Sequence, residues 1–170
     1  SKGKTMADQK KANSPSATRK RKKSSTEKIF GDGIMAHGYT GVPNIMIRAQ
    51  ARLGLNPAQF NILVQLLSYY IEPDRPPYPP KRHLLERTGM SEATLKKHLK
   101  ALEQAGFIER EQQYTSAGDF GSNIYHMKGL VAKLRKLVPG FDKEREEREE
   151  SRRKSERPNA RRNSVAKAAP

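Results

Sequence analysis

The side chains best suited to chemistry in this sequence are three lysines on one predicted helix, Lys96, Lys97 and Lys100. Leucines recur through the same stretch at intervals of four and three residues and form its apolar face, namely Leu95, Leu99 and Leu102. The lysines and the small side chain of Ala93 then lie on the opposite face. Ammonium groups on an exposed helix face bind phosphate oxygens, so this stretch predicts contact with a polyanion.

The lysine face has two interpretations. Such a face is most often simply solvated. A DNA major groove, however, admits one α-helix and has phosphates on both sides, which suits a helix with small residues at its start and lysines along its outer face. We favour the groove. The expected contacts to base edges come from Ser91, Ala93, Thr94 and Lys97. The expected contacts to phosphates come from Lys96, Lys100, Lys81 and Arg82.

The elements that must hold this face are two helices joined by a tight turn. Residues 81–106 predict a helix, a turn over 88–91 and a second helix that ends at Gly106. Gly89 can take the left-handed conformation that a sharp turn needs, and Ser91 is a favourable N-cap for the second helix. Leu84 and Leu85 would anchor the first helix in the core.

Two predicted strands follow, over residues 107–113 and 122–127. The glycine-containing segment 114–121 between them has the composition of a hairpin loop. Helix, turn, helix and hairpin in this order predict a winged helix-turn-helix, a mainly α fold with a small β-hairpin. The wing has no Lys or Arg between Arg110 and Lys128. It would support the fold or touch the DNA backbone through Ser116, Ser122 or Asn123.

Further segments complete the predicted domain. Asn56, Pro57 and Gln59 have the pattern of a capped helix start, and the helix should continue to residue 70 or 71. A shorter helix is predicted over 45–53. The proline-rich residues 72–80 predict a stiff, irregular spacer. Residues 130–138 predict an amphipathic helix stopped by Pro139-Gly140, whose apolar stripe belongs to the core or, alternatively, to a homodimer.

Charge divides the chain into three parts. The 170 residues hold 34 Lys+Arg and 18 Asp+Glu, a net charge of +16. Residues 1–28 carry +8, residues 29–141 carry +5 with nearly all the large apolar side chains, and residues 142–170 carry +3. These differences predict a disordered basic arm over 1–28, one domain over 29–141, and a charged helix with a disordered tail over 142–170.

The basic arm contains a run of five cations: Arg19, Lys20, Arg21, Lys22 and Lys23. We expect these side chains to contact phosphates, because a DNA-binding candidate follows in the chain. The alternatives are a solubilising tail and, in a eukaryotic source, a nuclear address.

The charged segment after residue 142 is polar on every side. Its opposite charges fall at helical spacing and predict a solvated helix, with the pairs Glu144–Arg148, Glu149–Arg153 and Glu150–Lys154. Disorder is expected from Pro158 onward. This tail is also the place where a protein partner would bind.

The sequence offers no sign of catalysis. It has no cysteine, its four histidines lack the spacing of metal ligands, and no phosphate-binding glycine motif occurs. We therefore expect no enzyme activity, no catalytic residues, no metal and no cofactor. No apolar run approaches the roughly 20 residues that span a bilayer, so a membrane partner is not expected. The expected location is the cytoplasm, at the nucleoid, or the nucleus if the source is eukaryotic.

Several short motifs resemble a known group of domains. They include Tyr78-Pro-Pro, Thr88-Gly89-Met90-Ser91 and Ala105-Gly106-Phe107-Ile108, which are similar to the winged helix-turn-helix domains of bacterial, phage and plasmid proteins. Residues 38–44 and the helix start at 55–60 also resemble the origin-binding domain of phage replication proteins of the lambda O type. The resemblance covers residues 38 to about 127 and implies a DNA-binding domain.

These observations predict a sequence-specific protein that binds double-stranded DNA, foremost a transcriptional regulator with a recognition helix in the major groove. A phage- or plasmid-type replication initiator that binds origin repeats is the first alternative. A structural protein that coats DNA without specificity is the second.

Overall fold

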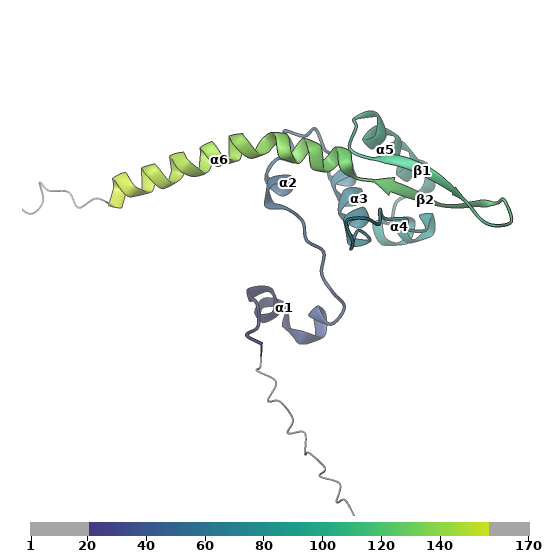
Figure 1. The fold of residues 1–170 in the computed structure, drawn as a ribbon, viewed down its shortest axis with the longest axis horizontal. Helices are drawn as coiled ribbons and strands as arrows, with labels where there is room; N and C mark the ends of the chain where they lie inside the picture. Colours follow the sequence, from purple (N-terminus) through teal and green to yellow (C-terminus); the bar gives the residue numbers. More distant parts are fainter. Residues whose placement is uncertain (1–20, 157–170) are drawn as a thin grey trace, which may run out of the picture. The chain divides into compact units, whose positions relative to one another are not determined.

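The computed structural model describes residues 21–156. The chain forms two compact units, Ser1–Gly38 and Tyr39–Pro170. The first contains helix α1, Ser25–Met35. The second contains, in chain order, α2 (Asn44–Arg48), α3 (Pro57–Ser68), α4 (Lys81–Thr88), α5 (Glu92–Gln104), β1 (Glu109–Tyr114), β2 (Phe120–His126) and α6 (Lys128–Glu156) (Figure 1). This is the predicted mainly helical fold with one hairpin.

Helix α1 begins with a reciprocal cap that the sequence analysis missed. Ser24 Oγ accepts a hydrogen bond from the N–H of Glu27 at 3.2 Å, and the Glu27 carboxylate accepts one from the N–H of Ser24 at 2.6 Å. The backbone turns at Gly31, whose φ of 79° only glycine adopts readily. Because α1 starts at Ser25, it crosses the boundary predicted between arm and domain at residue 28.

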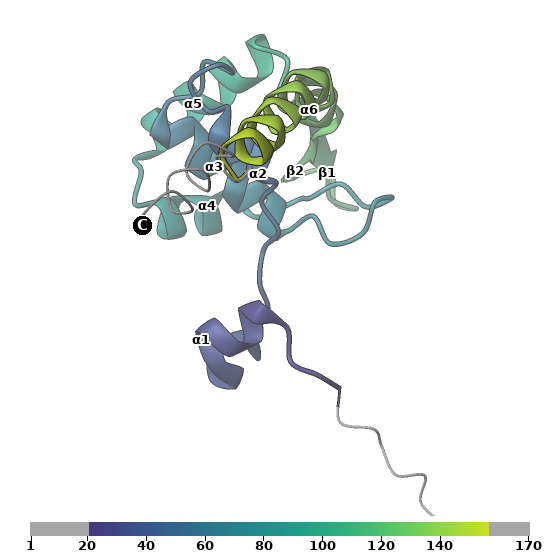
Figure 2. The same cartoon turned by 90° about the vertical axis from the view of Figure 1, so that its left-hand side faces the viewer.

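The helices of the second unit start where the sequence predicts. Asn56 and Gln59 form the capping box of α3 with Pro57 in its first turn. Helix α2 is shorter than the predicted segment 45–53: it ends at Arg48, and turns lead to Gly54 at φ 70°. Figure 2 shows α5 and α6 on opposite sides of α3.

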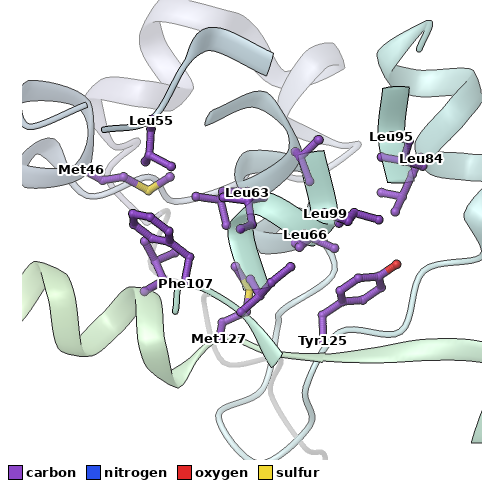
Figure 3. Packing of buried hydrophobic residues seen from close by; sticks show 14 residues of the cluster. Met46, Leu55, Leu63, Leu66, Leu84, Leu95, Leu99, Phe107, Tyr125 and Met127 are labelled. Carbon is purple, nitrogen blue, oxygen red and sulfur yellow. The ribbon is translucent and has the colours of Figure 1, made fainter. Parts of the chain in front are cut away.

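The core lies between α3, the helix-turn-helix and the start of α6. Ile62, Leu63 and Leu66 of α3 are fully buried. They belong to one cluster with buried side chains of α2, α4, α5, β2 and α6 (Figure 3). The predicted apolar face of α5 is confirmed, because its three leucines are at most 4% exposed, namely Leu95, Leu99 and Leu102. Burial of side chains of this kind stabilises a domain by about 1.5–3 kcal/mol each.

The proline-rich linker is irregular, as predicted, but it is not a free spacer. Pro77 and Pro79 are fully buried. The carbonyl of Pro77 accepts a hydrogen bond from the N–H of Tyr125 in β2, at 2.8 Å. The rigid prolines therefore attach the lead-in to α4 to the edge of the hairpin, where a missing N–H costs nothing.

The hairpin is a two-stranded antiparallel sheet, with Glu109 opposite His126 and Gln112 opposite Asn123. The register shifts between Gln112 and Tyr114. A short loop then closes through the N–H of Thr115, which donates to the carbonyl of Asp119 at 2.8 Å. The hairpin extends away from the helices, as a wing does (Figure 1).

Helix α6 corrects one prediction. The sequence predicts a stop at Pro139-Gly140, yet α6 runs unbroken from Lys128 to Glu156 with Pro139 inside it. An interior proline costs about 3 kcal/mol, so contacts beyond it must compensate. Phe141 supplies them, because it is 7% exposed and its ring centroid lies 4.6 Å from Cζ of Arg48 and 5.1 Å from Cζ of Arg52.

The ion pairs of α6 differ in part from those predicted. Glu150 and Lys154 pair at 2.7 Å as expected. The carboxylate of Glu144, however, bonds to α2 and its following turn, at 2.8 Å to Arg52 and 3.2 Å to Arg48. These hydrogen bonds, foremost that from Arg52, lower the pKa of Glu144. The tail helix is thus fastened to α2 at its start, which local charge spacing could not predict.

The apolar stripe over residues 130–138 mainly serves this chain's own core. Leu130 is 2% exposed, and Leu134 packs against the core cluster. Only Val131 and Val138 are left outward, each 38% exposed.

Candidate nucleic-acid interface

Helix α5 begins with two hydroxyl groups that hold each other. Ser91 Oγ accepts a hydrogen bond from the N–H of Thr94 at 3.2 Å and donates one to Thr94 Oγ1 at 2.9 Å. This is the predicted N-cap, and it satisfies one of the free donors of the first turn. Both residues are exposed, and the hydroxyl hydrogen of Thr94 stays available to an outside acceptor.

The outward face of α5 is as the sequence predicts. Its predicted DNA-contacting side chains are all exposed, namely Ala93, Thr94, Lys96, Lys97 and Lys100. Within residues 21–156, none of these three lysines takes part in an ion pair. Lys97 and Lys100 need not break an internal contact before they bind an outside anion, whereas Lys96 also interacts with the Glu92 carboxylate one turn earlier. This face is therefore ready for phosphate.

The start of α4 lies beside the start of α5. Lys81 and Arg82, both predicted to contact phosphates, are exposed. Lys81 Nζ lies 2.5 Å from Oε1 of Glu92, the first residue of α5. This hydrogen bond lowers the pKa of Glu92. Glu92 is a site residue that the sequence analysis missed, because it meets Lys81 only once the turn at Gly89 folds the two helices together.

A groove of about 650 Å³ separates α5 from the wing. Helices α4 and α5 contribute three cations to its lining, Lys81, Arg82 and Lys96. The hairpin contributes polar side chains that donate and accept hydrogen bonds, namely Gln112, Ser122 and Asn123. The predicted wing contacts Ser122 and Asn123 thus share one hollow with the lysines. Ser116 does not line it.

One ion pair fixes the wing to α5. The Arg110 guanidinium of β1 donates to the Glu103 carboxylate, which also accepts from the backbone N–H of Arg110 at 3.2 Å. The hydrogen bond raises the pKa of Arg110 and lowers that of Glu103, whose side chains are 25% and 29% exposed. Beside them, burial raises the pKa of the Tyr125 phenol. This pair aligns strand β1 with the last turn of α5.

The Glu103–Arg110 pair predicts a pH dependence. A lowered pKa in the folded state means that ionised Glu103 stabilises the domain above its ordinary pKa of 4.5. That contribution is lost as the pH falls through the lowered value. We expect Glu103→Gln to reduce stability near neutral pH and to flatten the acid loss of stability, measured by urea unfolding at several pH values. Glu146→Gln on the exposed tail helix is the control. Parallel pH profiles for wild type and Glu103→Gln would contradict the prediction.

Two of the histidines have structural partners. His83 Nδ1 lies 3.1 Å from the Tyr69 hydroxyl, and His126 Nε2 lies 2.7 Å from the Glu111 carboxylate. Over residues 21–156 the structure contains no group of three or more His, Asp or Glu arranged to hold a metal ion. In the same range, no helix is long and apolar enough to cross a membrane.

The predicted arm contacts belong to the first unit or lie outside the described residues. Arg21 pairs with Glu27, and Lys23 Nζ lies 2.6 Å from Asp32. Lys22 is exposed. Arg19 and Lys20, together with the residues from Pro158 onward, are not among the described residues. The arm's contribution to binding stays a prediction.

Comparison with known protein families identifies the type of domain that the central segment forms. A family model described as a helix-turn-helix domain matches residues 53–108, which run from the turn before α3 through α5. The hairpin β1–β2 follows at once. The chain contains a winged helix-turn-helix domain. This domain is of the kind that binds DNA. The resemblance to lambda O-type replication proteins is not confirmed by the comparisons.

Solved structures with some likeness to the chain cover between 64% and 78% of its length. The N-terminal domain of DnaD protein from Geobacillus kaustophilus HTA426 is 22% identical, with a TM-score of 0.49 over 68% of this chain and 93% of that one. A possible transcriptional regulator from Methanosarcina mazei Go1 is 19% identical, with a TM-score of 0.40 over 64% and 85%. MarR is 20% identical, with a TM-score of 0.34 over 78% and 96%. With TM-scores below 0.5, these likenesses carry no functional argument. No curated protein matches the chain significantly in sequence.

Proposed function

We propose that this protein binds double-stranded DNA with a preferred sequence, through α5 in the major groove, and that it regulates transcription. The observation that carries the proposal is the set of exposed lysines on the outward face of α5, Lys96, Lys97 and Lys100. They lie on the second helix of a helix-turn-helix, the element that enters the major groove in this motif.

The contacts divide by chemistry. Ala93, Thr94 and Lys97, with Ser91 at the cap, face outward where base edges would lie: a methyl group, a hydroxyl donor and an ammonium donor. Lys96 and Lys100 flank them and would bind phosphates, as would Lys81 and Arg82 at the start of α4. The run 19–23 would add contacts that depend on charge and not on sequence.

The groove beside α5 supports a role for the wing in holding one strand of the DNA. Gln112, Ser122 and Asn123 provide neutral hydrogen-bonding groups that suit phosphate and sugar oxygens. The wing brings no lysine into the groove: its cation there, Arg110, is paired with Glu103, and the other cations come from α4 and α5. The wing would thus position the duplex without entering the minor groove.

A substitution at Lys97 tests the proposal. We expect Lys97→Ala to weaken binding to a duplex selected from random sequences by about 1–3 kcal/mol and to weaken binding to an unselected duplex much less. Fluorescence anisotropy on the two duplexes measures both losses. Lys143→Ala, which removes the same charge from the tail helix, is the matched control and should leave the ratio unchanged. Equal losses on both duplexes for Lys97→Ala would remove this residue from base recognition.

The dependence of the binding constant K on salt measures the number of phosphate contacts, since log K falls with log salt at a slope of about −5 if six phosphates are neutralised.

A genome-wide map of bound DNA tests the biological role. Discrete sites at promoters support a regulator, a cluster at one origin supports a replication initiator, and binding everywhere supports a DNA-coating protein.

Partner proteins remain proposals. A homodimer through residues 130–138 would have to use Val131 and Val138, the two outward apolar side chains of that segment, and light scattering would detect it. A protein partner for the tail after residue 142 stays a prediction.

A further inference from the structure

The charges of α6 are divided between its two halves. Residues 128–141 contain four cations and no acid: Lys128, Lys133, Arg135 and Lys136. Residues 142–156 contain six cations and seven acids. The mixed charges of the second half are sufficient to stabilise a solvated helix. The excess of cations in the first half does not have this effect and requires a separate explanation.

Ion pairing follows the same division. In the second half, cations pair with acids of the same helix, as in Arg145–Asp142 at 3.1 Å, Arg152–Glu156 at 3.3 Å and Lys154–Glu150 at 2.7 Å. In the first half none of the four cations makes an ion pair with any described residue. Lys133 has one contact, with its Nζ 4.9 Å from the centroid of the Phe107 ring.

Three of these four cations lie on the outer side of the helix, and Lys133 lies at its half-buried edge. Leu130 and Phe141 are buried, and Leu134 packs against the core. Arg135 and Lys136 are exposed, as is Lys128, which lies two turns before Arg135. The hollow beside Lys128 is also lined by Glu103 and Glu109, so the purely basic part of the face is Arg135, Lys136 and the flanking Lys133.

Cations at this end of a helix do not stabilise it. The first turn of α6 has no acid and begins with Lys128, although the N-terminal end of a helix dipole is positive. Lys133 and Lys136 are like charges three residues apart, a spacing that costs a few tenths of a kcal/mol. An anionic partner on this face would offset both effects.

We propose that this face of α6, formed by Arg135 and Lys136 with Lys133 at its edge, binds the phosphate backbone of a second DNA duplex while α5 holds the first. Figure 2 shows α5 and α6 on either side of α3, and in Figure 1 α6 runs away from α5 and the hairpin. The proposal rests on DNA binding by α5, and it gives the protein a bridging activity. The occupant is a duplex because exposed cations side by side on a helix suit the repeated phosphates of a DNA backbone.

A capture experiment tests the bridge with the full chain. One duplex is fixed to beads, the protein is bound, and a fluorescent second duplex is added at low salt. We expect Arg135→Gln with Lys136→Gln to retain binding to the fixed duplex within about twofold and to capture about tenfold less of the second one, through two lost phosphate contacts. Glutamine keeps the helix propensity and removes only the charge. Lys143→Gln with Arg152→Gln removes the same charge from the paired half and should capture as wild type does.

Each other outcome overturns the proposal. Capture that survives Arg135→Gln with Lys136→Gln but is lost in Lys97→Ala with Lys100→Ala assigns both duplexes to α5 faces of a dimer. Equal loss in the control variant assigns capture to bulk charge. Loss of the first duplex together with the second places α6 in the primary interface. Failure to capture DNA, with capture of an acidic protein instead, assigns the face to that class of partner. The assay works with two duplexes of random sequence. It therefore tests DNA binding by α6 even if α5 proves to bind DNA without a preferred sequence.

Discussion

Gly129→Ala should be among the most destabilising single substitutions in this domain. A Cβ at position 129 would overlap the carbonyl oxygen of Gly106 and lie 3.0 Å from its carbonyl carbon. Both are backbone atoms of the turn that ends α5, so neither can rotate away. The close approach lets the N–H of Leu130 donate to the carbonyl of Phe107 at 2.8 Å. Overpacking of this kind costs about 1–3 kcal/mol, and the backbone neighbour puts Gly129→Ala at about 3 kcal/mol.

The matched control lies on the same helix. A Cβ at Gly140 meets nothing within 4 Å. We expect Gly140→Ala to leave the domain at least as stable as wild type, with a gain of up to about 1 kcal/mol from helix propensity. Urea unfolding followed by circular dichroism measures both variants. If the two alanines have the same effect, the start of α6 does not press against the end of α5.

Phe141→Ala is expected to release the second half of α6. The ring is the apolar anchor beyond Pro139, and it holds the guanidinium groups of Arg48 and Arg52 that bind Glu144. Loss of a buried phenylalanine costs about 3–5 kcal/mol, and the place of Phe141 at the edge of the core favours the lower figure. Without the ring, the missing hydrogen bond at Pro139 should stop the helix there. Amide hydrogen exchange over residues 142–150 would then rise sharply.

Two further variants make this result specific. Val138→Ala, on the outward side of the same turn, should cost less than about 1 kcal/mol and leave exchange unchanged. Adding Pro139→Ala to Phe141→Ala restores the lost donor and should recover part of the protection, since an interior proline costs about 3 kcal/mol. Unchanged protection in Phe141→Ala alone would show that the tail helix does not depend on this anchor.

Local patterns were enough to predict the helix-turn-helix. The cap at Ser91, the left-handed Gly89 at φ 67° and the leucine spacing of α5 are each written within a few neighbouring residues. The same is true of the exposed lysines, because the buried leucines determine where the opposite face lies. These predictions are correct because the tertiary contacts favour the same conformations as the local sequence does.

The features that sequence reasoning missed depend on residues far apart in the chain. Pro139 reads locally as a helix stop, and only Arg48 and Arg52, more than eighty residues earlier, show why the helix continues. The sequence around the linker prolines predicts only a spacer. Their burial depends on packing against β2, which lies far along the chain. The pairing of Lys81 with Glu92 needs the angle between two helices, which residue types do not specify.

The hydrogen bond from Tyr125 to Pro77 also bears on how the domain would meet DNA. It ties β2 to the segment that leads into α4, while Glu103 and Arg110 tie β1 to α5. Both walls of the groove are therefore joined to the hairpin before any ligand arrives. A surface assembled in advance loses little conformational entropy when it binds. Little of the free energy of the lysine–phosphate contacts would then be lost to ordering the protein, so most of it would contribute to the affinity. The distance between α5 and the wing would be the same before and after binding, and it would limit which DNA backbone widths fit between them.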